Sequence, residues 1–130
     1  MALTKNKRSF GSAEVWSLFR DAGYLKPTRL QSRLVPLILQ GKDVALEAER
    51  NSGKTAAFVL PLLLKAKKGR AGTKAVVLAS TIEETRKIER EFRRFSDSNR
   101  ETTVAVLGAE PADRREHRLL AREPQVVVGT

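Results

Sequence analysis

The chain has 130 residues, of which 41% are hydrophobic, and this size and composition suit one globular domain with a single core. The sequence has no cysteine and one histidine, His117, which excludes disulfides and thiolate metal sites and disfavours a histidine-based metal centre. An excess of 25 Lys and Arg over 15 Asp and Glu gives a net charge of +10, which favours a polyanionic partner such as nucleic acid.

The N-terminal stretch is polar and basic, and we expect residues 1–9 to form a disordered leader to a domain at residues 10–130. No stretch resembles a signal peptide or is apolar for long enough to span a bilayer. We therefore expect no membrane contact and a cytoplasmic location.

Two helices are predicted at the start of this domain. Residues 12–22 carry an apolar side, with Ser12 as N-cap and Gly23 as the end signal. The second helix follows Pro27 and runs to about Leu39, because leucine and isoleucine recur there at helical spacing.

A third stretch has the layout of a phosphate-binding loop. Residues 44–48 predict a short strand, residues 48–55 read Ala-Glu-Arg-Asn-Ser-Gly-Lys-Thr, and residues 56–67 predict a helix that Pro61 kinks or ends early. In such a layout the loop N–H groups and the helix N-terminus face phosphates, Lys54 reaches the β- and γ-phosphates, and Thr55 ligates Mg²⁺.

The loop departs from the general pattern G-x-x-x-x-G-K-[ST] at its first position, where Ala48 replaces glycine. Asn51 stands in the middle of the loop, and asparagine tolerates a positive φ angle better than other non-glycine residues. The alternative is an ordinary strand-to-helix turn that contains a Gly-Lys pair.

Strands and helices then alternate to the end of the chain. Apolar runs at residues 75–79, 103–107 and 125–130 predict strands, with a charged helix at residues 82–95 and another from Pro111 between them. Alternation predicts a three-layer α/β domain with a mainly parallel sheet of about four strands. The nucleotide should lie at the carboxyl ends of the strands.

Two motifs of DEAD-box RNA helicases resemble stretches of this chain in order and spacing. The stretches that resemble the Q motif and motif I are Gly23-Tyr24-x-x-Pro27-Thr28-x-Leu30-Gln31, Pro36-x-Ile38-Leu39-x-Gly41-Lys42-Asp43-Val44 and residues 48–55. The resemblance implies a P-loop NTPase domain of recombinase-like type, with ATP and Mg²⁺ as cofactors. By position it implies that Gln31 reads the adenine edge and that Tyr24 stacks on the adenine ring.

The chemistry of glutamine supports its implied role, because one amide donates and accepts at the same time, as adenine requires. Each residue also has a simpler interpretation, with Tyr24 in the core beside a helix end and Gln31 facing solvent. The residues expected to bind ATP and Mg²⁺ are Tyr24, Lys26, Gln31, Glu49, Arg50, Asn51, Ser52, Gly53, Lys54 and Thr55, with Thr55 as the metal ligand.

RNA contacts are implied at Thr81, Gly108 and Thr130, which align with motif Ia, the paired-glycine loop and the start of motif Ib. Ile82 stands where the family places an arginine, and Ala109 replaces the second glycine, so contacts at both places should be weaker. A role of Thr81 as helix N-cap, in a capping box with a glutamate, explains that residue equally well.

The sequence contains no Asp-Glu-x-Asp tetrad after a predicted strand and no second recombinase-like domain. We therefore expect an incomplete domain from a longer protein, which carries the adenine and phosphate half of an ATPase site. The favoured interpretation is the ATP-binding part of an ATP-dependent RNA helicase. The alternatives are a non-catalytic nucleic-acid binder whose loop is altered at Arg50 and Asn51, and a fragment of another P-loop NTPase or kinase.

Overall fold

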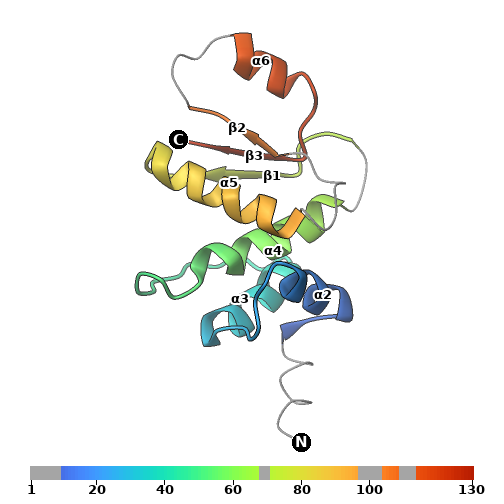
Figure 1. The fold of residues 1–130 in the computed structure, drawn as a ribbon, viewed down its shortest axis with the longest axis vertical. Coiled ribbons are helices and arrows are strands. Elements are labelled where there is room, and N and C mark those ends of the chain that lie inside the picture. Colours follow the sequence, from blue (N-terminus) through green and yellow to red (C-terminus); the bar gives the residue numbers. More distant parts are fainter. Residues whose placement is uncertain (1–9, 68–70, 97–103, 109–113) are drawn as a thin grey trace, which may run out of the picture.

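The computed structural model describes residues 10–67, 71–96, 104–108 and 114–130 (Figure 1). The predicted leader at residues 1–9 lies outside these ranges. The elements are, in chain order, α2 (Ala13–Asp21), α3 (Arg29–Leu39), α4 (Lys54–Lys67), β1 (Ala75–Leu78), α5 (Ile82–Ser96), β2 (Val104–Val106), α6 (Arg114–Leu120) and β3 (Val126–Gly129).

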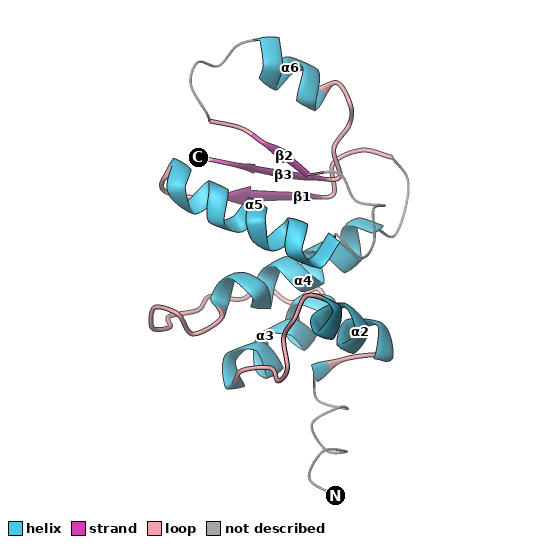
Figure 2. Cartoon of the chain, in the orientation of Figure 1, coloured by secondary structure: helices cyan, strands magenta, loops and turns pink. Residues whose placement is uncertain are grey.

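The three strands form a parallel sheet in the order β1-β3-β2, which confirms the predicted α/β class. The central strand β3 is buried along its whole length, as a parallel strand between two neighbours should be. Helices α2 and α3 lie at one end of the molecule, α6 lies beside β2 at the other, and α5 runs between the sheet and α4 (Figures 1 and 2).

The strand predicted at residues 44–48 is not formed, and residues 42–49 have no regular secondary structure. Val44 and Leu46 are 41% and 45% exposed, whereas an inner strand would bury both. A strand needs a neighbour to take its backbone hydrogen bonds, and the described part of the chain pairs none with this segment. The apolar run alone did not identify a strand that could pair with this segment.

A glycine ends α2, as predicted, and another ends α3 by the same local geometry. After α2, the N–H of Gly23 donates to Arg20 O at 2.8 Å, and the N–H of Tyr24 donates to Phe19 O at 3.1 Å. Gly23 has φ +88°, which an L side chain rarely adopts. The same two bonds recur after α3 around Gly41, so both helix ends were readable from the sequence.

Helix α4 passes through Pro61 and continues to Lys67, so of the two outcomes predicted at Pro61, a kink or an early end, the early end does not occur. Eight of its residues are buried, including Pro61 itself, and packing on both sides holds the helix despite the missing backbone donor. No helix in the described ranges has the length and apolarity that crossing a membrane requires.

The hydrophobic core lies where α4 and α5 meet the sheet. Helix α5 buries Ile88, Phe92 and Phe95, the stripe that its spacing predicts, while Arg86, Lys87, Arg90 and Arg93 are exposed. Phe92 and Phe95 are both 0% exposed. These aromatic side chains join the N-terminal helices to the sheet in one core.

Replacing Phe92 with alanine should lower the free energy of unfolding by about 3–5 kcal/mol, because a buried aromatic ring is lost and a cavity remains. Denaturant titration followed by the fluorescence of Trp16, the only tryptophan, measures the change. The control Arg86→Ala, at an exposed position of α5, should change the value by less than about 0.5 kcal/mol. Equal losses in the two variants would contradict this assignment of the core.

Candidate nucleotide site and RNA-facing edge

The loop before α4 is a tight turn closed by its own side chains. Asn51 has φ 58° and Gly53 has φ 85°, so the positive φ angle expected of Asn51 is confirmed. The hydroxyl of Ser52 donates to Glu49 O at 2.7 Å. Together these features bring the chain directly into the first turn of α4.

Lys54 folds back across this loop. Its ammonium group donates to Ala48 O at 2.7 Å, which joins the two ends of the motif. A phosphate oxygen can replace this neutral acceptor, and a charge-assisted hydrogen bond to it would be stronger. Lys54 and Thr55 also open α4, where the first N–H groups have no intrahelical acceptor and the helix dipole favours an anion.

Gln31 is buried, with 2% of its surface exposed, so the interpretation as a solvent-facing helix residue is wrong. Its backbone N–H donates to Thr28 Oγ1 at 3.2 Å, and its Oε1 accepts from Thr28 N–H at 2.9 Å, which forms a capping box at the start of α3. The same two side chains reach the loop. Gln31 Nε2 donates to Gly53 O at 3.3 Å, and Thr28 Oγ1 donates to Ser52 O at 3.2 Å.

Only glycine fits at position 53 in this arrangement. A Cβ on Gly53 would lie 2.6 Å from Gln31 Nε2 and 3.3 Å from Thr28 Oγ1. The positive φ angle adds backbone strain for any other residue. The requirement for glycine therefore comes from the approach of α3 as well as from the turn.

The ring of Tyr24, which was predicted to stack on adenine, is covered by protein side chains. It stacks on Phe19 at 4.8 Å and on Phe95 at 5.7 Å between centroids. The guanidinium carbon of Arg94 lies 4.3 Å from the centroid of the Tyr24 ring, and the phenol donates a hydrogen bond to Glu91. These contacts match the alternative of a core residue beside a helix end, because protein groups already cover the ring.

The remaining predicted nucleotide-binding residues are at the surface. Lys26 is exposed on the segment that leads into α3, and Glu49 and Arg50 are exposed in the loop. Thr55 is partly buried in the first turn of α4. One threonine hydroxyl is a fitting protein ligand for Mg²⁺, since this ion keeps several waters and takes phosphate oxygens as further ligands. The described residues contain no cluster of His, Cys, Asp or Glu that could bind a metal by itself.

The three predicted RNA contacts follow three neighbouring strands. Thr81 comes after β1, Gly108 after β2 and Thr130 after β3, and because the strands are parallel these residues share one edge of the sheet. A Cβ on Gly108 would lie 2.9 Å from Thr130 Oγ1, so these two residues are in contact. The N–H of Gly108 donates to Glu116 Oε1 at 2.7 Å.

Thr81 caps α5, as its alternative role predicts. Its hydroxyl accepts from the N–H of Glu84 at 3.2 Å. The carboxylate of Glu84 accepts from Ser80, at 2.6 Å from the hydroxyl and 3.1 Å from the N–H. The hydrogen bonds from Ser80 hold the pKa of Glu84 below its ordinary value.

Four residues of these sites were missed in the sequence. Thr28 had a signal, since Thr-x-x-Gln before an apolar run is a capping box. The sequence contains no signal that would identify Glu91, Arg94 or Glu116. The bond from Arg94 to Ala22 O, for example, spans 72 positions.

The fold is that of an α/β domain of the P-loop NTPase type. The chain belongs to the DEAD/DEAH box helicase family, whose model matches residues 28–130. The family and the fold inferred from the Q-motif and motif I resemblance are therefore confirmed.

Relatives of known identity cover nearly all of the chain. It is 34% identical over 125 residues to the ATP-dependent RNA helicase DBP10 of Vanderwaltozyma polyspora, covering 94% of this chain and 13% of the relative. A solved ATP-dependent RNA helicase from Sulfolobus tokodaii, described as hypothetical, has a TM-score of 0.77 and 29% identity, covering 92% of this chain and 34% of that one. The structure of the RNA helicase Prp28 from Chaetomium thermophilum bound to ADP has a TM-score of 0.80 and 31% identity. The match covers 95% of this chain and 31% of the Prp28 chain. The chain therefore spans a small part of the proteins it matches.

Ionisation of Tyr24, the only tyrosine, reports on its aromatic cluster. Burial and the hydrogen bond to Glu91 raise its pKa from the ordinary 10.0 to about 12. Because the folded pKa lies above the unfolded one, the stabilisation is complete below pH 10 and is lost as pH rises toward 12. Phenolate absorbance should show a midpoint near pH 12 in the folded chain and near 10 in denaturant. A folded midpoint equal to the denatured one would contradict these contacts.

Proposed function

We propose that the chain is the ATP-binding portion of a DEAD-box ATP-dependent RNA helicase, which binds ATP with Mg²⁺ and contacts RNA but does not hydrolyse ATP by itself. The observation that carries the proposal is the contact between the Thr28–Gln31 capping box and the carbonyls of Ser52 and Gly53. This contact places the proposed adenine reader directly beside the proposed phosphate loop. Support also comes from the similarity to Prp28, which was solved with ADP bound.

Gln31 retains the hydrogen-bonding capacity that adenine needs. Its amide has two N–H donors and an oxygen with two lone pairs. One donor is used on Gly53 O, and one lone pair on the N–H of Thr28. The second donor and the second lone pair match the acceptor and donor that adenine presents side by side. Guanine presents a different pattern, so the proposal includes a preference for ATP over GTP.

The phosphates would lie against the first turn of α4. Lys54 would exchange Ala48 O for the β- and γ-phosphate oxygens, and the hydroxyl of Thr55 would ligate Mg²⁺. Mg²⁺ supplies charge neutralisation between the β- and γ-phosphates. Lys26, Glu49, Arg50 and Asn51 are proposed to line this site.

Replacing Lys54 with alanine should weaken ATP binding about 10- to 100-fold, because a charge-assisted hydrogen bond to the phosphates is lost. Isothermal titration calorimetry with ATP and Mg²⁺ measures the change, and Lys65→Ala, at an exposed lysine in the last turn of the same helix, is the matched control. Equal affinity for ATP and GTP would argue against Gln31 as an adenine reader.

The alternative proposal is a non-catalytic nucleic-acid binder, and the net charge of +10 is the observation that favours it. RNA binding that weakens with added salt, together with no heat on adding ATP and Mg²⁺, would select this alternative. Membership of the DEAD/DEAH box helicase family excludes the third interpretation, a fragment of another P-loop NTPase or kinase.

RNA is proposed to bind along the edge formed by Thr81, Gly108 and Thr130, with its phosphates facing backbone N–H groups and hydroxyls. This part of the proposal rests on the shared edge of the sheet and on the contact between Gly108 and Thr130. The cytoplasmic location stays a prediction.

Glu116 should oppose RNA binding, because its carboxylate occupies the Gly108 N–H that a phosphate would use. The variant Glu116→Ala should bind single-stranded RNA several-fold to about 10-fold more tightly, as measured by fluorescence anisotropy at fixed salt. Glu14→Ala removes the same charge at an exposed site on α2 and is the control. If both variants gain equally, the effect is one of net charge, and Glu116 has no specific role.

A further inference from the structure

Helix α5 holds the segment between α2 and α3 through one arginine and one aromatic ring. Arg94 Nε donates to Ala22 O, the C-cap carbonyl of α2, at 2.6 Å. The guanidinium of the same residue covers the ring of Tyr24, and the phenol of Tyr24 donates to Glu91 one turn earlier on α5. The segment that begins at Gly23 is therefore bound to α5 at both its backbone and its first large side chain.

The other end of this segment is bound to the phosphate loop. Thr28 and Gln31 donate to the loop carbonyls, and Tyr24 precedes Thr28 by only a few residues. Pro27, which is buried, lies between them and restricts the backbone. A displacement at Tyr24 would therefore be transmitted over a short, stiff stretch to the amide of Gln31.

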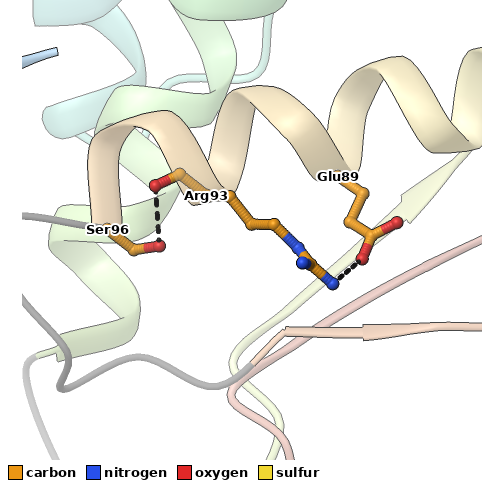
Figure 3. Close-up of polar contacts among 3 residues, drawn as sticks. All are labelled: Glu89, Arg93 and Ser96. Carbon is orange, nitrogen blue, oxygen red and sulfur yellow. Dashed lines mark hydrogen bonds and ion pairs between the residues drawn. The ribbon is translucent and has the colours of Figure 1, made fainter.

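The neighbouring arginine on α5 makes no such connection. Arg93 has a side chain that is 71% exposed and pairs with Glu89 of its own helix at 2.5 Å, as Figure 3 shows. Its carbonyl accepts from Ser96 Oγ at 3.2 Å, also within α5. Of these two adjacent arginines, Arg94 contacts residues 22–24 through a hydrogen bond and a ring contact, whereas the side chain of Arg93 pairs within its own helix.

We propose that Arg94 is a positioning residue for the nucleotide site, which fixes the segment from Gly23 to Gln31 and thereby sets the preference for adenine nucleotides. This inference rests on the proposed ATP-binding function. Without Arg94 the segment would sample more positions, and the amide of Gln31 would be in place for only part of the time. Apparent affinity for ATP falls in proportion to that fraction, whereas GTP, which does not use the amide in this way, is unaffected.

The test compares wild type, Arg94→Ala, Arg94→Lys and Arg93→Ala by calorimetric titration of the full chain with ATP–Mg²⁺ and with GTP–Mg²⁺. Arg94→Ala should lose about 3- to 10-fold in affinity for ATP, the size expected for one lost hydrogen bond, and little for GTP. Arg93→Ala should match wild type for both nucleotides. Arg94→Lys keeps the positive charge without the planar guanidinium, so it should show the same change in smaller measure.

Trp16 fluorescence checks that each variant is folded before titration, and Arg94→Lys carries the test if Arg94→Ala does not fold. An unchanged ratio of ATP to GTP affinity in the Arg94 variants, or an equal fall in Arg93→Ala, would overturn the positioning role while leaving the proposed function intact. If wild type binds neither nucleotide, the proposed function and the positioning role fail together.

Discussion

The hydrogen bonds between the first turn of α3 and the loop before α4 are the constraint on which the site depends. Thr28 and Gln31 cap α3 with one set of atoms and bind the carbonyls of Ser52 and Gly53 with another. Gln31 is almost fully buried, and a buried amide must have its partners, so moving the loop away from α3 would cost the bond to Gly53 O. The same closeness excludes a side chain at position 53. The capping box at the start of α3, the closed loop and the glycine at position 53 therefore depend on one another.

Helix α5 connects this constraint to the rest of the molecule. Near its C-terminal end it holds Tyr24 and Ala22 O, and its buried phenylalanines fill the core against α4 and the sheet. At its N-terminal end it begins at Thr81, on the edge where RNA is proposed to bind. Helix α5 thus contacts the segment that precedes Gln31 near one end and begins at the proposed RNA-binding edge at the other. No coupling between them follows from this alone, because coupling requires an element with two arrangements.

Local signals in the sequence predicted local structure well. They did not predict contacts between residues that are distant in the sequence. The ends of α2 and α3 were predictable because Gly23 and Gly41 specify helix termination within a few residues. The absence of a strand at residues 44–48 was not predictable, because an apolar run does not show whether another strand will pair with it. Tyr24 shows why the site could be predicted only in part. The sequence alone does not distinguish an aromatic ring that stacks on a ligand from one that stacks on Phe19.

The polar side chains around the loop bind the loop's own carbonyl groups, and this bears on how ATP would bind. Lys54 has an acceptor in Ala48 O, Ser52 in Glu49 O, and Gln31 in Gly53 O, so each of these side chains is already held in place. Phosphate binding would then require the exchange of one neutral acceptor for a charged one at Lys54. In the proposed site, the affinity for ATP would depend on this exchange at Lys54 and on the second donor and second lone pair of the Gln31 amide.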